Sequence, residues 1–90
     1  MIPLHDELRE IREAKNITLE AISDHTKIRV ELLERLEKGD YSIAPAPYLR
    51  AFLREYGEFI GIDPDSVIAR YEKKSDRLIA IDSIETKSDA

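Results

Sequence analysis

The sequence predicts an all-α fold, a bundle of five short helices, and three observations predict it. Leu, Ile and Val recur at intervals of three and four residues, which is the period of one helix face. Residues typical of helix starts and stops, such as Thr18, Gly39 and Asp63-Pro64, separate these apolar segments. A strand-like pattern occurs only at residues 78–81, a run too short to change the fold class.

The first two helices are predicted over residues 3–15 and from Thr18 onward. Asn16 ends the first helix, and the Thr18 hydroxyl is a typical cap for the start of the second. Glu20 then lies near the positive N-terminus of the second helix, where an acid is favourable. The apolar residues that these two helices would bury are Leu4, Leu8, Ile11, Leu19 and Ile22.

A tight turn and a third helix follow. The turn is predicted at residues 25–27, Ile28 would return into the core, and the third helix is predicted over residues 29–38. Gly39 fits the left-handed position that closes a helix. The inward residues of the third helix would be Leu32, Leu33 and Leu36. Two short helices joined by such a turn form a helix-turn-helix, whose second helix commonly enters the DNA major groove.

The fourth helix is predicted over residues 47–60, after a loop at residues 40–46. Proline disfavours a helix ahead of this point, whereas Pro47 suits the first turn of a helix. Gly61 would end the helix.

The last helix is predicted over residues 64–74, since Asp63-Pro64 combines a cap with proline at the first helical position. Its buried residues would be Val67, Ile68 and Tyr71. Residues 1–74 thus form one helix-turn-helix domain, and residues 75–90 form a polar tail or linker. This tail could also form a short edge strand or an ordered extension packed on the domain.

Charge is distributed unevenly along the 90 residues, whose net charge is −5. Residues 1–26 carry three basic and six acidic side chains, residues 27–74 carry nine of each, and residues 75–90 carry two and four. DNA-binding domains commonly show a positive stripe, so this balance argues against tight DNA binding. The sequence shows no signal peptide and no apolar run of about 18 residues, which predicts cytoplasmic localisation. A membrane location would require a transmembrane segment after Ala90.

The residues that support catalysis are missing from the sequence. The chain has no cysteine, so disulfides and thiolate metal sites are excluded. His5 and His25 are its two histidines, and neither has acids at ligand spacing. The three glycines are scattered and form no phosphate-binding loop. We therefore predict no catalytic residue, no cofactor and no metal, and a protein that is not an enzyme.

The fourth helix carries two neighbouring apolar stripes. Its aromatic residues follow one another at intervals of four, four and three: Tyr48, Phe52, Tyr56 and Phe59. Its aliphatic stripe consists of Leu49, Leu53 and Ile60. One helix can seldom bury both stripes in so small a domain, so part of the aromatic stripe would be exposed and, with arginine, could bind a protein partner. The candidate partner-binding residues are Tyr48, Arg50, Phe52, Arg54 and Tyr56. In the alternative, all four aromatic residues pack in the core.

The third helix provides the candidates for DNA binding. The residues that would face a groove or reach phosphates are Lys27, Arg29, Val30, Glu31, Arg35 and Lys38. However, the helix also carries Glu31, Glu34 and Glu37, which would lie near negative phosphates. Glu31–Arg35 and Glu34–Lys38 have the spacing of helix-surface ion pairs, so a solvated, self-paired face is favoured over base recognition.

Several segments together resemble a known family. Five helices containing a helix-turn-helix resemble the Xre/lambda-repressor type of domain. The segments that carry a closer likeness are Thr18-Leu-Glu-Ala, Thr26-Lys-Ile-Arg29, residues 33–40, residues 47–56 and Gly61-Ile-Asp-Pro64. In this order and spacing they resemble the cytoplasmic domain of the RodZ family of bacterial cell-shape proteins, over roughly residues 4–72.

The resemblance implies a function different from that of the parent fold. RodZ-like proteins tether this domain through a transmembrane helix and bind the actin-like MreB filament. Their partner surface corresponds to Tyr48 and Phe52 in this sequence. Docking onto an MreB-like filament in cell-shape control is therefore the first hypothesis. The alternative is a DNA-binding transcriptional regulator of the Xre type.

Overall fold

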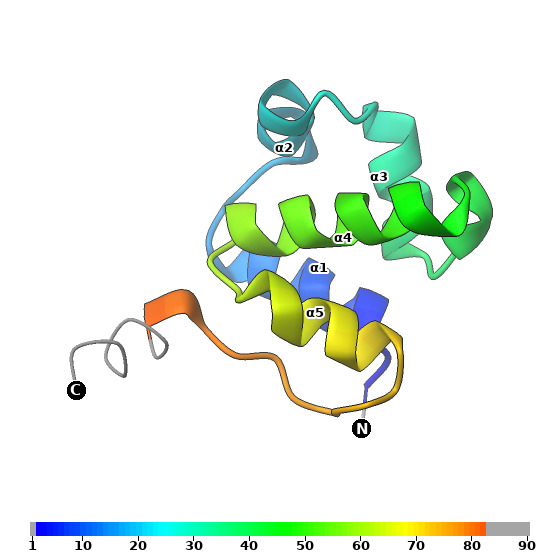
Figure 1. Cartoon of the computed structure of the whole chain (residues 1–90). Helices are drawn as coiled ribbons and strands as arrows, with labels where there is room; N and C mark the ends of the chain where they lie inside the picture. Colours follow the sequence, from blue (N-terminus) through cyan, green and yellow to red (C-terminus); the bar gives the residue numbers. More distant parts are fainter. Residues whose placement is uncertain (1, 83–90) are drawn as a thin grey trace.

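The computed structural model describes residues 2–82, and within this range the fold is the all-α bundle that the sequence predicts (Figure 1). Five α-helices and one 3-10 helix follow one another along the chain. Their bounds are α1 (Leu4–Ala14), α2 (Leu19–Thr26), α3 (Val30–Glu37), η1 (Tyr41–Ile43), α4 (Ala46–Phe59) and α5 (Pro64–Tyr71).

All five α-helices contribute to one hydrophobic core. In Figure 1, α2 and α3 form the upper part of the molecule, α4 crosses its middle, and α5 lies below α4. Helix α4 packs most extensively against α5. The largest fully buried side chains are Leu8, Ile22, Leu33, Leu36, Leu49, Leu53, Tyr56, Ile60 and Val67. Each helix therefore buries one apolar face against the others, as expected of amphipathic helices around a single core.

The ends of the helix-turn-helix follow the predicted capping signals. The Thr18 hydroxyl accepts a hydrogen bond from the backbone N–H of Ala21 at 3.1 Å, which confirms Thr18 as the cap of α2. Gly39 has a φ of 86°, so it occupies the predicted left-handed position after α3.

The turn between α2 and α3 lies at residues 27–29, two residues later than predicted. His25 and Thr26 belong to the last turn of α2, and Lys27, with a φ of 67°, closes this helix in the left-handed region. Ile28 is buried, as predicted. The left-handed Lys27, the buried Ile28 and the extended Arg29 therefore turn the chain into α3.

The segment predicted as a loop, residues 40–46, contains the short helix η1. Its cap is Asp40, whose carboxylate accepts a hydrogen bond from the backbone N–H of Ser42 at 3.0 Å. Helix α4 begins at Ala46, one residue earlier than predicted, because the carbonyl of Pro45 already accepts the first hydrogen bond of the helix.

Helix α5 ends at Tyr71 rather than at residue 74. Lys73 has a φ of 63°, and the backbone N–H of Lys74 donates to the carbonyl of Ala69 at 2.8 Å. This hydrogen bond across a left-handed residue is a frequent way to close a helix and reverse the chain.

The chain after α5 runs back along this helix to the turn between α4 and α5 (Figure 1). The backbone N–H of Asp63 donates to the carbonyl of Ile79 at 2.7 Å, and the N–H of Ile81 donates to the carbonyl of Gly61 at 3.0 Å. Of the forms considered for the tail, an ordered extension is therefore the one that residues 75–82 adopt. The rest of the predicted tail, residues 83–90, lies outside the described residues.

Helix length also bears on membrane insertion. The longest helix is α4, with 14 residues. Over residues 2–82, none of the helices combines the length and the apolar character needed to cross a bilayer.

Candidate functional site

An apolar surface lies at the start of α4. Tyr48 is the most exposed of the large hydrophobic side chains in the described part of the chain, at 63%. The three residues before it, Pro45, Ala46 and Pro47, are also exposed, whereas Phe52, one turn later, is half-buried against the core. We call these five residues the α4 patch.

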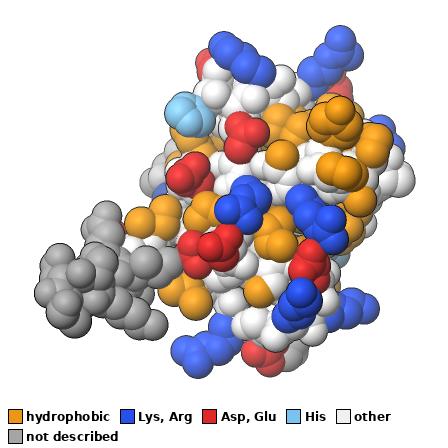
Figure 2. Space-filling model, in the orientation of Figure 1, with side chains coloured by type: hydrophobic (Ala, Val, Ile, Leu, Met, Phe, Trp, Pro, Cys, Tyr) orange, Lys and Arg blue, Asp and Glu red, His pale blue; other side chains and the backbone are white. Residues whose placement is uncertain are grey.

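The α4 patch is exposed because of how the helix starts. The helix begins with a proline on each side of Ala46, and Leu49 is its first residue to enter the core. Figure 2 shows hydrophobic side chains gathered over this end of α4. Contiguous apolar surface of this kind marks interaction sites on soluble domains.

Arg50 and Arg54 do not belong to the α4 patch, although the sequence suggested that they flank it. The guanidinium of Arg50 lies 2.8 Å from the carboxylate of Glu72, and that of Arg54 lies 2.9 Å from the carboxylate of Asp65. Both acids belong to the α5 side of the molecule. Residues two apart on an α-helix point about 200° apart, so Tyr48 and Arg50 lie on opposite sides of α4.

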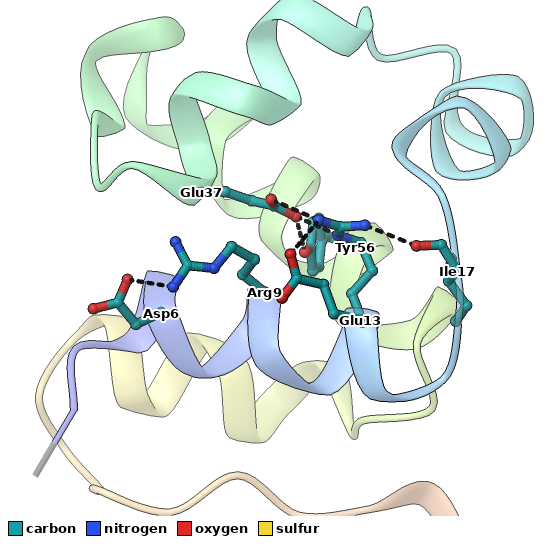
Figure 3. Close-up of polar contacts among 7 residues, drawn as sticks. Asp6, Arg9, Glu13, Ile17, Glu37 and Tyr56 are labelled. Carbon is teal, nitrogen blue, oxygen red and sulfur yellow. Dashed lines mark hydrogen bonds and ion pairs between the residues drawn. The ribbon is translucent and has the colours of Figure 1, made fainter.

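Tyr56 is likewise excluded from direct contact with a partner, because its side chain is fully buried. Its hydroxyl donates a hydrogen bond to the carboxylate of Glu37 on α3 (Figure 3). Burial and this carboxylate raise the pKa of Tyr56 well above its ordinary value of 10.0, so the phenol stays neutral. Phe59, the last member of the aromatic stripe, is half-buried and packs against the ring of His25, with 5.0 Å between ring centroids.

Glu37 also binds Arg12 of α1. Glu37 is therefore a buried structural residue and not part of a solvated acidic face with Glu31 and Glu34. Arg12 donates from Nε to Oε2 of Glu37 at 2.6 Å and from Nη2 to Oε1 at 3.0 Å, and its Nη1 donates to the carbonyl of Ile17 at 2.8 Å. Burial alone would lower the pKa of Arg12, but the hydrogen bonds and charge of Glu37 raise it above its ordinary value. Figure 3 also shows the ion pair between Arg9 and Asp6, with 3.5 Å between Nη2 and Oδ1.

The candidate DNA-binding face is not self-paired as predicted. Arg35 donates from Nε to the carboxylate of Asp40 at 2.9 Å and forms no ion pair with Glu31. Hydrogen bonds from Ser42 and from Arg35 lower the pKa of Asp40 to about 2. Glu34 and Lys38, the second predicted pair, likewise form no ion pair among residues 2–82.

The other DNA-binding candidates are distributed over both sides of the turn. Lys27, Arg29 and Glu31 are exposed, and Val30 is half-buried. A shallow hollow between α2 and α3 is lined by Ser23, Arg29, Val30, Glu31 and Glu34. Cations and acids therefore share this surface, and a continuous positive strip is not formed there.

The residues that sequence reasoning missed are Pro45, Ala46 and Pro47. The signal was present, because four small or cyclic apolar residues at 44–47 are followed by the aromatic Tyr48 where a helix is starting. In this fold α4 enters the core only at Leu49, so the residues just before it stay exposed. Within the described range, no group of three His, Cys, Asp or Glu side chains is placed to hold a metal ion.

Comparison with known proteins agrees with the helix-turn-helix fold. Residues 7–67 match the model of a helix-turn-helix domain family. The chain is 28% identical over 83 residues to the cytoskeleton protein RodZ of Streptococcus pneumoniae, covering 91% of this chain and 29% of that protein. It is 36% identical over 58 residues to the uncharacterized membrane protein YmfM of Bacillus subtilis, covering 63% and 20%.

A third relative, an uncharacterized protein of Haemophilus influenzae, is 34% identical over 61 residues, covering 66% of this chain and 20% of that protein. The chain thus spans less than a third of the length of each of these relatives. No solved structure matches it.

Proposed function

The chain belongs to the helix-turn-helix domain family and is RodZ-like within it, and from this premise we propose that it is a non-catalytic docking domain for a cytoskeletal filament. The partner would be an MreB-like filament of the actin family, in bacterial cell-shape control. The α4 patch would make the contact.

The observation that carries this proposal is the exposure of Tyr48 at the centre of the α4 patch. Exposed aromatic side chains surrounded by smaller apolar residues commonly dominate the energy of protein–protein binding. The likeness to the cytoskeleton protein RodZ supports a filament as the partner. The likeness to a membrane protein supports a place at the inner face of the cell membrane, as part of a longer anchored chain.

DNA binding is the second candidate, and one observation favours it. Lys27, Arg29 and Lys38 border the helix-turn-helix and form no ion pairs in the described part of the chain, so they could bind phosphates. The exposed carboxylates of Glu31 and Glu34 on the same helix oppose this use, because they would lie against the phosphate backbone.

Co-sedimentation with polymerised MreB tests the first proposal. Tyr48→Ala is expected to weaken pelleting by about tenfold or more in affinity, since truncation of an aromatic anchor removes most of its contact area. The matched control is Ile2→Ala, which shortens another exposed hydrophobic side chain outside the α4 patch. Pelleting of the Tyr48 variant at wild-type affinity would rule out the α4 patch as the docking surface.

Salt dependence separates the two candidates. Binding through an aromatic surface should change little between low and moderate salt, whereas DNA binding should weaken steeply through counterion release. A mobility shift with random duplex at low salt, abolished by Lys27→Ala with Arg29→Ala, would favour the DNA candidate over the filament.

A further inference from the structure

The segment after α5 is held mainly by backbone groups. Asp63 N–H donates to the carbonyl of Ile79 at 2.7 Å, and Ile81 N–H donates to the carbonyl of Gly61 at 3.0 Å. The N–H of Ile79 donates to Oγ of Ser66 at 3.0 Å. Three hydrogen bonds thus bind an extended segment to the α4–α5 turn and to the first turn of α5, much as an added strand binds to a sheet edge.

Side chains contribute less to this attachment. Leu78 is half-buried and packs against the core, and Ile81 is also half-buried, whereas Ile79 is 40% exposed and Ala80 is exposed. By contrast, each of the five α-helices buries an apolar face in the core. A segment with few buried apolar contacts can open without unfolding of the rest of the domain.

The position of the segment determines where the chain leaves the domain. Arg50, near the start of α4, pairs with Glu72, just after α5, while Arg54 pairs with Asp65 at the start of α5. The end of α5 therefore lies beside the start of α4. The segment carries the chain back from there to Gly61, at the opposite end of α4 (Figure 1).

We propose that residues 78–81 form a releasable clasp that selects the point at which the chain leaves the domain. When the clasp is closed, the chain leaves at the end of α4, about 20 Å along the helix axis from Tyr48. When the clasp is open, the chain is last held at the end of α5, beside the start of α4 and on the Arg50 side of that helix. The freed residues 75–81 can extend over about 23 Å.

The clasp would let the domain change the point at which the chain leaves it, which the α4 patch alone cannot do. Tension on the following chain, or a partner that binds residues 78–81, would shift the exit from one end of α4 to the other. This inference goes beyond the proposed function and does not require it, because the clasp and the α4 patch are separate sets of residues.

The test measures the exit point directly. The chain has no cysteine, so spin labels can be placed through Ala46→Cys and Ala80→Cys, both at exposed positions. The closed clasp should give a narrow distance distribution in double electron–electron resonance. Adding Ile79→Pro and Ile81→Pro removes two donor N–H groups, and the narrow population should fall by more than half.

Two controls make the result decisive. Ile79→Val with Ile81→Val keeps both N–H groups and should keep the narrow distribution. Far-ultraviolet circular dichroism of the proline variant should show the full helical signal. A broad distribution in the doubly labelled parent, an unchanged distribution in the proline variant, or loss of its helical signal would each overturn the proposal.

Amide hydrogen exchange of the unmodified chain provides an independent measurement. The amides of Asp63, Ile79 and Ile81 should exchange at similar rates, at least tenfold faster than the amide of Leu53 in the middle of α4. Exchange of all four amides at one rate would mean that the clasp opens only when the domain unfolds, which contradicts release.

Discussion

Glu37 is the residue at which three helices meet. It lies on α3, accepts hydrogen bonds from Arg12 of α1, and accepts another from Tyr56 of α4. The Arg12 and Glu37 side chains are only 12% and 8% exposed. Removing one member of such a buried pair takes the closest opposite charge away from the other in a poorly solvated place.

We expect Glu37→Ala to lower the free energy of unfolding by about 3 kcal/mol, because the largely buried guanidinium of Arg12 loses its closest counter-charge and keeps only the exposed carboxylate of Glu13, at 3.6 Å. Glu34→Ala is the matched control, since it removes an exposed acid from the same helix and should change stability by less than about 0.5 kcal/mol. Urea unfolding followed by circular dichroism measures both. Equal effects of the two substitutions would show that the pair contributes little.

The role of Glu37 could not be predicted from the sequence. It lies in a run with Glu31 and Glu34 at helix spacing, which indicates a charged outer face. Its partner Arg12 is 25 residues away, and only the packing of α1 on α3 brings the two together. The opposite directions of Tyr48 and Arg50, by contrast, follow from helix geometry and could have been derived from their spacing alone.

The turn between α2 and α3 is the element that most distinguishes this helix-turn-helix. Its left-handed residue is Lys27, with a φ of 67°. An L-residue with a side chain is strained in this region, where glycine is not. Lys38, the residue that closes α3, has an ordinary φ of −96°. Two lysines thus close neighbouring helices in opposite backbone conformations.

Lys27→Gly is therefore expected to raise the free energy of unfolding by about 0.5–1 kcal/mol, through relief of left-handed strain. Lys38→Gly should lower it by a similar amount, about 0.5–1 kcal/mol, because glycine gains nothing at a negative φ and makes the unfolded chain more flexible. Thermal unfolding of both variants gives the comparison. A change of the same sign in both would contradict a conformational origin.

The helices themselves were largely predictable, because their signals are local. Thr18, Gly39 and Gly61 mark helix ends in the sequence and in the structure. The boundaries that differ depend on non-local or fine geometry. Lys73 ends α5 early by turning left-handed, and Ile79 and Ile81 form backbone hydrogen bonds with residues 16 and 20 positions earlier. The sequence pattern of residues 78–81 fits a strand, and a single bridge to Ile62 is what forms.

At the scale of the whole molecule, the bonds between Arg12, Glu37 and Tyr56 join α1, α3 and α4 across the core (Figure 3). Ionisation of the Tyr56 phenol would place a second negative charge beside Glu37 in a buried position. Burial and Glu37 therefore raise the pKa of Tyr56 above its ordinary value of 10.0. Because the unfolded chain loses this proton more readily than the folded protein does, the free energy of unfolding falls at alkaline pH.

We expect the free energy of unfolding to be unaffected by this group below pH 10 and to fall as the pH rises above about 10. Tyr56→Phe should make this decline shallower. Burial raises the pKa of Tyr41 as well, so part of the slope should remain. Urea unfolding at several alkaline pH values measures the slope, and identical slopes in both proteins would contradict the assignment.

The two prolines at the start of α4 have a consequence for the strength of binding. Pro45 and Pro47 fix two backbone dihedral angles, and the helix fixes those of Ala46 and Tyr48. A tyrosine side chain has only two rotatable bonds to be immobilised. Little conformational entropy is therefore left to lose when the α4 patch meets a partner, so even a small contact area can bind tightly.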